Sequence, residues 1–467
     1  MIKKVTMVGG DHSQMDVCPV ESTSNETYNV TTGEFEWDGA TQTMALNGGS
    51  IGMIVTYLIS ARLCELFGVK RLVGYSLLIS GVLDCLQPTF IRLNVWIYIT
   101  VLIIRGICLG TLIPGFNIIL ARWINEKERL QLASFIFSAQ ILGTLLAMFT
   151  AGTIVTTFGW QGAFYINGSL TLPFFISWMY FMYDSPSQHP RISEEEINYL
   201  LRSTNMDNMV VPVAPWLEII TNLPLWAHIS VNLAVAWISF TIATELPLYL
   251  TKVLNYSINQ TSLISALPHL AQLTSNVFCA LLSQWIRNKG YLSKMTCYRI
   301  FNVIATFGPA IMMITIPQLG CDHGAIVGVL VVAMFLNGAY YGGSFMNILD
   351  LGPNYAGSIA AFVSTFSSTI QFVAPMLAGI LTDKNTLSAW NTVFYISAAI
   401  TSLPVTLYFI FGSTDEQPWN KINSCNEVGN GNEKHINWDN KLTINDGKCD
   451  EIIKQIGDLK YPEKEEK

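Results

Sequence analysis

Apolar residues are concentrated in long runs along the chain, and short polar segments separate one run from the next. A helix of about 20 apolar residues crosses the ~30 Å hydrocarbon core of a bilayer, and eleven runs reach that length. They cover residues 44–63, 72–90, 95–120, 131–157, 161–183, 225–250, 261–284, 299–317, 323–345, 356–382 and 391–411. The pattern therefore predicts an all-α polytopic membrane protein with about eleven transmembrane helices.

The polar segments divide the chain into five parts. The longest internal segment contains a capping box at Ser193 and Glu196, which predicts a short polar helix, and prolines then break the chain. Five apolar runs precede this segment and six follow it. We predict an external arm, a first helix bundle, a cytoplasmic linker, a second bundle and a disordered tail. Their bounds are 1–43, 44–183, 184–224, 225–411 and 412–467.

Charged residues are scarce outside the tail. The chain is 51% hydrophobic and 13% charged, whereas about 25% charged is usual for a soluble protein. Lipid must therefore surround most of the protein, which excludes a nucleic-acid binder and a secreted disulfide domain. The nine cysteines form no CxxC pair or cluster with histidine, so we expect no metal site or other cofactor. An enzyme is disfavoured because no His, Asp or Ser pairing within the runs has catalytic spacing.

Lysine and arginine are distributed unevenly between the two sides of the predicted membrane. Alternate loops after the first run hold twelve basic residues, and the opposite set of loops holds three. Because basic loops stay in the cytoplasm, we predict a cytoplasmic tail and an external or luminal arm. Glycosylation sequons agree with this orientation, since they lie in the arm and in one predicted external loop. The four acceptor residues are Asn25, Asn29, Asn255 and Asn259.

A series of short motifs occurs in a fixed order along the second part of the chain. The motifs are Asp-Ser-Pro-Ser-Gln-His-Pro at 184–190, Ile-Ser-Glu-Glu-Glu at 192–196, Pro-Trp at 215–216, Pro-Leu-Trp at 224–226, Thr-Glu-Leu-Pro-Leu-Tyr-Leu at 244–250, Leu-Ile-Ser-Ala-Leu-Pro at 263–268, Trp-Ile-Arg-Asn-Lys-Gly at 285–290, Asn-Ile-Leu-Asp at 347–350, Pro-Asn-Tyr-Ala at 353–356 and Gln-Pro-Trp at 417–419. With these motifs, the chain from Trp37 to Trp419 resembles one family of the major facilitator superfamily. That family contains sodium/phosphate cotransporters, sialin and the vesicular glutamate transporters.

The resemblance implies twelve helices in two bundles that rock around a central anion site, usually with H+ or Na+ coupling. It implies a small anionic substrate and a plasma, vesicular or lysosomal membrane, and we expect a monomer. The family's first helix would precede the arm, yet residues 1–43 contain no apolar run long enough to span. Two hypotheses stay open. One is a secondary transporter of inorganic phosphate or organic anions that works by alternating access; the other is a truncated or degenerate member that acts as a non-transporting binding or regulatory protein.

Arg105 is the one lysine or arginine well inside an apolar run. At 1.5 Å per residue it lies roughly 16 Å below the outer end of its helix. A guanidinium there costs ~3 kcal/mol or more unless it is paired or faces water, and its planar shape suits carboxylate or phosphate. Arg105 is therefore predicted to attract the substrate anion, and the alternative is a structural arginine bonded to a neighbouring helix. Asp84, near an outer helix end, is predicted to be solvated.

Several positions that are often polar or charged in the family are apolar in this chain. The usual basic residue of the third run aligns with Leu102, and Arg105 is a candidate substitute because it lies on nearly the same helix face. Leu109 stands at an often acidic position, Val235 at an often basic one and Leu46 at a polar one. These apolar replacements argue against glutamate as the substrate.

Further candidates lie in the second bundle. Trp237 and Phe240 are candidate substrate contacts, although aromatic residues in membrane helices more often pack or line the interface. Glu245 either couples transport to H+ or Na+ or shapes the end of its helix. Asn347 and Asp350 lie near a cytoplasmic helix end, where we predict a gate or loop hydrogen bond, with substrate binding as the alternative.

The segment 60–71 resembles the superfamily's Gly-x-x-x-Asp-Arg-x-Gly-x-Lys loop, which latches the inward gate by charge pairing. Its charged candidates in this chain are Glu65, Lys70 and Arg71. Leu66 stands where the pattern has arginine, so we predict a weakened latch.

Overall fold

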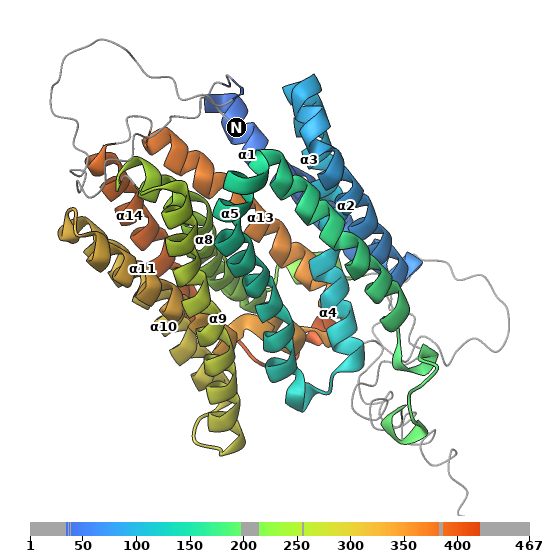
Figure 1. Ribbon diagram of the computed structural model, residues 1–467. Coiled ribbons are helices and arrows are strands. Elements are labelled where there is room, and N and C mark those ends of the chain that lie inside the picture. Colours follow the sequence, from blue (N-terminus) through green and yellow to red (C-terminus); the bar gives the residue numbers. More distant parts are fainter. Residues whose placement is uncertain are drawn as a thin grey trace, which may run out of the picture. The chain divides into compact units, whose positions relative to one another are not determined.

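The computed structural model describes residues 34–35, 37, 39–197, 214–254, 256–382 and 386–420. The sequons at Asn25, Asn29 and Asn255 lie outside these residues, as does the predicted disordered tail from residue 421 onward. Helices make up nearly all of the regular structure in the described ranges (Figure 1).

The first half of the chain forms five long helices. They are α1 (Gly39–Phe67), α2 (Val69–Leu93), α3 (Val95–Leu109), α4 (Leu112–Trp123) and α5 (Glu126–Phe181). A short helical turn at 194–197 follows them. The Glu196 backbone N–H donates to Ser193 Oγ at 3.2 Å, which is one of the two bonds of the predicted capping box.

The second half begins with a short helix and continues with long ones. Its α-helices are α7 (Trp216–Ile220), α8 (Leu223–Lys252), α9 (Ile258–Asn288), α10 (Lys294–Thr315), α11 (His323–Asn337), α12 (Asn347–Leu351), α13 (Ala356–Leu381), α14 (Leu387–Ser402) and α15 (Pro404–Phe411). Short 3-10 segments include η2 (Ile316–Leu319) and η3 (Gly338–Gly342), which directly continue α10 and α11.

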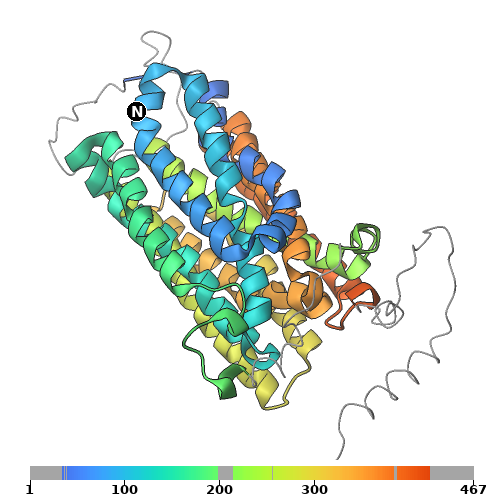
Figure 2. The same cartoon turned by 90° about the vertical axis from the view of Figure 1, so that its right-hand side faces the viewer.

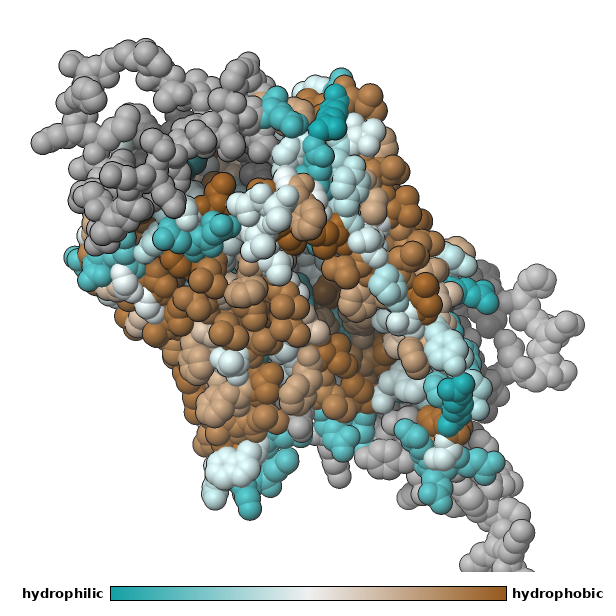
Figure 3. Space-filling view, viewed as in Figure 1, coloured by the Kyte–Doolittle hydropathy of each residue, from teal (hydrophilic) through white to brown (hydrophobic). Residues whose placement is uncertain are grey.

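Each of the eleven predicted apolar runs falls on helix. In the described part of the chain, eight helical segments are long and apolar enough to cross a membrane. One of these, Leu132–Phe181, contains two predicted runs because α5 bends at Gly159, whose φ of 71° is a conformation that glycine adopts readily. The more polar helices α2 and α9 cover the two remaining runs. A broad hydrophobic band lies between hydrophilic ends on the face seen in Figure 3.

Three predicted runs are interrupted. The third run divides into α3 and α4 at Gly110 and Thr111, and the last divides before Pro404, which has no N–H for the helical ladder. The chain of α11 tightens into η3 at Gly338, where a Cβ would lie only 2.7 Å from Ser275 Cβ. Glycine at this position therefore allows α9 and the end of α11 to approach closely.

The two halves of the chain meet along two helix pairs, α1 with α13 and α5 with α9 (Figures 1 and 2). At the end that carries the predicted cytoplasmic loops, one buried apolar cluster includes residues of both halves. The Phe137 ring meets the Phe345 ring edge to face at 5.0 Å. A Cβ at Gly357 would lie 2.5 Å from Ile118 Cγ1, so α13 and α4 are in close contact. The predicted cytoplasmic end is therefore packed shut.

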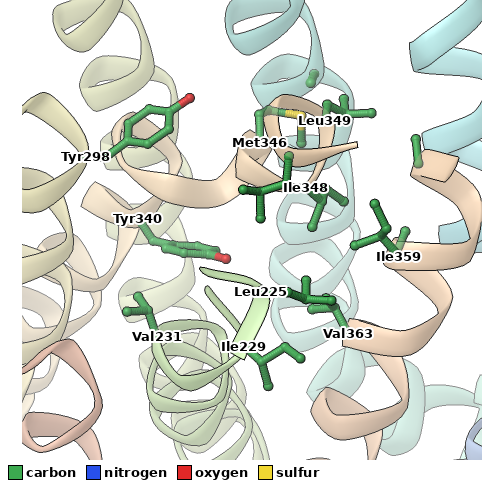
Figure 4. Packing of buried hydrophobic residues seen from close by; sticks show 14 of the residues in the cluster. Leu225, Ile229, Val231, Tyr298, Tyr340, Met346, Ile348, Leu349, Ile359 and Val363 are labelled. Atoms are coloured by element: carbon green, nitrogen blue, oxygen red, sulfur yellow. The ribbon is translucent and has the colours of Figure 1, made fainter. Parts of the chain in front are cut away.

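The same cluster joins α8 to the broken segments after α11. Figure 4 shows Leu225, Ile229, Tyr340, Ile348, Ile359 and Val363 converging from α8, η3, α12 and α13. Their packing fixes the position of η3, which carries part of the site described next.

Candidate functional site

Arg105 on α3 and Asp84 on α2 form an ion pair within the first half. The distance from Arg105 Nε to Asp84 Oδ1 is 2.6 Å, and Gln87 Nε2 donates to the same oxygen at 2.7 Å. Asp84 is only 5% exposed, so the prediction that it is solvated is wrong. The physical reason is the α2–α3 hairpin, since Asp84 lies ten residues before Asn94 and Arg105 eleven after it. The two antiparallel helices therefore bring these residues to the same depth.

The ion pair uses only one edge of the guanidinium. An arginine has five N–H donors, and Asp84 contacts Nε. No acceptor in the described part of the chain bonds the two Nη groups. The Arg105 side chain is 32% exposed, whereas that of Asp84 is 8% exposed. Arg105 thus combines the pairing expected of a structural arginine with a free fork that can bind an oxyanion through two parallel hydrogen bonds.

Leu102 and Val235, which replace residues that are often charged in the family, are buried among apolar side chains. Leu102 is 8% exposed and packs with Ala45, Ile91 and Tyr98 at the outer end of the first half. Val235 is also 8% exposed and belongs to the large apolar cluster. The side chain of Leu46 lies outside the described residues.

Neutral polar side chains meet in the second half at the point where α11 becomes η3. Gln272 Nε2 on α9 donates to Asn337 Oδ1 at 3.0 Å, and Ser239 Oγ on α8 donates to the same oxygen at 3.1 Å. Asn337 Nδ2 donates to the Val235 carbonyl at 3.4 Å. Gln272 and Asn337 are both buried. Amide and hydroxyl groups thus tie three membrane helices together.

A second set of bonds extends this network to α13. Asn232 Nδ2 donates to the Tyr340 hydroxyl at 3.1 Å, and Ser367 Oγ donates to Asn232 Oδ1. Asn276 is 0% exposed, and neither its amide nitrogen nor its oxygen has a hydrogen-bond partner in the described residues. We name these seven residues the amide cluster: Asn232, Ser239, Gln272, Asn276, Asn337, Tyr340 and Ser367.

The amide cluster has the features of a transporter binding site. It contains donors and acceptors but no charged side chain, and it surrounds a discontinuous helix, a feature often found at substrate sites near the bilayer midplane. Asn232, Ser239 and Ser367 are half-buried, whereas Gln272, Asn276, Asn337 and Tyr340 are buried. A search of the sequence for charged residues could not identify the amide cluster, because none of its residues is charged. The signal was the presence of asparagine and glutamine within apolar runs, where each amide needs a partner.

Trp237 and Phe240 lie on α8, in the other half of the chain from Arg105. Trp237 is 5% exposed, and its Nε1–H donates to Ser397 Oγ on α14 at 3.0 Å. This bond gives Trp237 a packing contact between α8 and α14. Phe240 is half-buried, and its carbonyl accepts a hydrogen bond from the Thr244 hydroxyl within α8.

Asp350 and Asn347 lie on α12 near the predicted cytoplasmic end. Asp350 Oδ1 is 2.7 Å from Lys294 Nζ, and its Oδ2 accepts a hydrogen bond from the Tyr298 hydroxyl at 2.9 Å. Burial raises the pKa of the Asp350 carboxyl, and the nearby Lys294 ammonium opposes that rise. Asn347 Nδ2 donates to the Tyr408 hydroxyl at 3.1 Å. Both residues therefore fasten α12 to neighbouring helices.

The predicted gate loop is held mainly by contacts within the first half. Glu65 pairs with Arg62 of its own helix at 2.9 Å, while the Lys70 ammonium lies 4.0 Å from the centre of the Tyr183 ring. The Lys70 backbone N–H donates to Asp184 Oδ1 at 2.8 Å. Arg71 is exposed. Asp184, the first residue of the motif at 184–190, holds the loop through the backbone, a role that the motif itself did not indicate.

The two remaining predicted residues, Glu245 and Asn259, lie on α8 and α9. Glu245 is 6% exposed on α8 and makes no ion pair with any described residue. Asn259 is exposed in the first turn of α9, whereas the neighbouring sequon at Asn255 lies outside the described residues.

Comparison with known proteins identifies the family. Residues 23–375 match the Major Facilitator Superfamily. Sialin of Homo sapiens is 29% identical over 410 residues, which cover 88% of this chain and 83% of that protein. A putative inorganic phosphate cotransporter of Drosophila melanogaster is 30% identical over 395 residues, covering 83% of this chain and 75% of that protein.

A vesicular glutamate transporter and a solved symporter structure complete the comparison. Vesicular glutamate transporter 1 of Xenopus laevis is 29% identical over 391 residues, covering 83% of this chain and 68% of that protein. The structure of a proton:xylose symporter bound to 6-bromo-6-deoxy-D-glucose shares the fold with a TM-score of 0.64 at 15% identity, covering 80% of this chain and 87% of that one. The chain is therefore a membrane transporter of the major facilitator superfamily, in the family that contains sialin, putative inorganic phosphate cotransporters and vesicular glutamate transporters.

Proposed function

We propose that this transporter carries small anions, inorganic phosphate or organic anions, by alternating access coupled to H+ or Na+. The observation that carries the proposal is the Arg105–Asp84 pair. Arg105 belongs to a membrane helix, and the two Nη groups of its guanidinium make no bond to a described residue. A phosphate or carboxylate that binds there gains two charge-assisted hydrogen bonds. Asp84 meanwhile keeps the arginine compensated when no substrate is bound.

The packing of the two halves supports entry from the predicted external side. The apolar cluster closes the predicted cytoplasmic end, so an anion reaching Arg105 in this conformation comes from the opposite side. The amide cluster in the second half, where the Asn276 amide has no partner among the described residues, then supplies neutral hydrogen-bonding groups to the rest of the substrate. When the halves rock, the apolar contacts around Phe137 and Phe345 separate and the site opens inward.

We further propose that the tail is cytoplasmic and that the protein resides in the plasma membrane or a vesicular or lysosomal membrane. Asn259, in a predicted external sequon, is exposed in the first turn of α9. This exposure supports the orientation inferred from the basic loops.

Uptake into proteoliposomes tests the proposed function. We expect the wild type to take up labelled phosphate or a labelled organic acid, and Arg105→Ala to abolish uptake because the anion loses its only predicted cation. Arg92→Ala is the matched control, since Arg92 is 55% exposed near the outer end of α2. Unchanged uptake by Arg105→Ala would contradict the role of Arg105. No uptake by the wild type across a panel of anions would favour the non-transporting alternative.

A further inference from the structure

A small cavity lies between α8, α10, α11 and α14, and no residue of the amide cluster lines it. Most of its lining is apolar, including Ile238, Leu246, Met313, Leu330 and Phe394. Only Thr241, Glu245 and Tyr249 bring side-chain oxygens to the lining, and Trp390 brings an indole N–H. The cavity is therefore a largely hydrocarbon space with one acidic group.

Two buried polar atoms of the cavity lining lack protein partners among the described residues. Thr241 is 6% exposed and Trp390 is 1% exposed, yet neither Thr241 Oγ1 nor Trp390 Nε1 has a hydrogen-bond partner in the described residues. Tyr249 packs its ring edge to face against Trp390 at 5.2 Å and so fixes the indole. Buried donors and acceptors normally find a partner in protein or ordered water. The arrangement points to a water-sized, hydrogen-bonding occupant beside Glu245.

No charged group on the surrounding helices forms an ion pair with Glu245 among the described residues. The Thr244 side chain hydrogen-bonds Glu245, and Lys252, which is exposed near the end of α8, attracts its charge without pairing with it. On α10, Lys294 and Arg299 lie in the first turns, at the opposite end of the helix from the cavity. His323 is the first residue of α11, and α14 carries no charged residue. Glu245 thus needs either a proton or a small cation from solution.

The composition of the cavity favours the proton. Hard cations are held by shells of several oxygen atoms, and here only three lining side chains carry oxygen. A protonated carboxyl is neutral, so it avoids the desolvation cost of a buried charge. It can also donate one hydrogen bond and accept others, which suits a water that bridges it to Thr241 and Trp390.

We propose that Glu245 is the proton-coupling site of the transporter, an inference that rests on the proposed function. In the conformation described, the Glu245 carboxyl carries the proton, and a water connects it to Thr241 Oγ1 and Trp390 Nε1. When α8 moves and water enters the cavity, the O–H bond breaks, the proton passes to that water, and the hydrated carboxylate remains. Return of a proton from water restores the acid. Ser239 of the amide cluster also lies on α8. Proton transfer at Glu245 and substrate binding at the amide cluster therefore both involve this helix.

Proteoliposome transport separates coupling from substrate movement. We expect wild-type protein to accumulate labelled phosphate or a labelled organic acid under an inward proton gradient but not under an inward Na+ gradient. Glu245→Gln should lose gradient-driven accumulation while it keeps exchange of labelled for unlabelled substrate, because the amide imitates the protonated acid. Asp322→Asn is the control, since Asp322 is an exposed cap of α11 and asparagine can also cap.

The possible outcomes distinguish this inference from the proposed function. Proton-driven accumulation by Glu245→Gln, or Na+-driven accumulation by the wild type, would overturn the assignment of Glu245. Absence of both accumulation and exchange in the wild type would instead overturn the proposed function.

Infrared spectroscopy of the purified protein tests the protonated acid without any substrate. We expect a carboxylic-acid carbonyl band near neutral pH that disappears in Glu245→Gln and shifts in Thr241→Val, which removes one hydrogen-bonding group at similar volume. Identical spectra for wild type and Glu245→Gln would contradict the proposal, provided that both proteins elute as folded monodisperse particles.

Discussion

The two halves of the transporter place different chemistry in the membrane. The first half carries one ion pair between adjacent helices, Arg105 with Asp84. The second half carries the amide cluster, whose bonds link α8, α9, α11, η3 and α13 without any charge. Its acid, Glu245, lies in a separate apolar cavity. In our proposals, anion attraction belongs to the first half, whereas neutral coordination and proton coupling belong to the second.

The difference also has an energetic consequence. A buried ion pair is costly to break on one side, because the remaining charge stays desolvated. A network of neutral amides is less sensitive, since each membrane hydrogen bond contributes roughly 0.6 kcal/mol on average. Mutations in the first half should therefore have larger effects than isosteric changes in the second.

The largest expected effect is at Asp84. Asp84→Leu leaves Arg105 without its counter-ion, and we expect the loss of about 3 kcal/mol of stability, the lower end of the range for buried pairs because Arg105 is 32% exposed. Thermal unfolding in detergent measures this loss. The double variant Asp84→Leu with Arg105→Leu should recover most of the stability. A double variant as unstable as the sum of the single variants would show that the two residues are not coupled.

An intermediate effect is expected in the amide cluster. Asn337→Leu removes the oxygen that accepts from both Gln272 and Ser239, so the Ser239 hydroxyl loses its acceptor and the Gln272 amide keeps only its 3.3 Å bond to Ser239 Oγ. We expect a loss of about 1–2 kcal/mol and a raised KM for the transported anion. Thr274→Val is the control, because the Thr274 hydroxyl is exposed and bonds only its own helix backbone. Equal effects of the two variants would contradict the role given to the cluster.

The smallest effect is expected at Trp237. Trp237→Phe removes the hydrogen bond to Ser397, which should cost about 1 kcal/mol and leave the KM unchanged. Parallel measurements of unfolding and uptake check both parts. A strongly raised KM with normal stability would instead restore Trp237 as a substrate contact.

Hydrophobic patterning predicted the helices well because the bilayer imposes their length. All eleven runs fall on helix, and the break in α5 at Gly159 lies between two predicted runs. The internal break at Gly338 was not predicted, and the glycine there lies against Ser275 on α9. Hydropathy reports the environment of a segment, whereas such a break depends on a neighbour that is distant in sequence.

The candidate site could be predicted only in part. Arg105 stood out because a lone guanidinium in an apolar run is costly, and the nearly equal distances of Asp84 and Arg105 from Asn94 could have indicated their pairing. Asn276 and Asn337 could not be assigned in this way, because their role depends on which helices pack together. The same holds for Glu245, whose surroundings come from four separate helices.

The central claim is that the free edge of Arg105 binds the transported anion. Phenylglyoxal modifies accessible arginines, and mass spectrometry can locate the modified residue in the purified protein. We predict modification at Arg105 in buffer without substrate and concentration-dependent protection by the transported anion, with Arg92 modified equally in both conditions. Modification of Arg105 that is unchanged by a saturating concentration of that anion would contradict the claim.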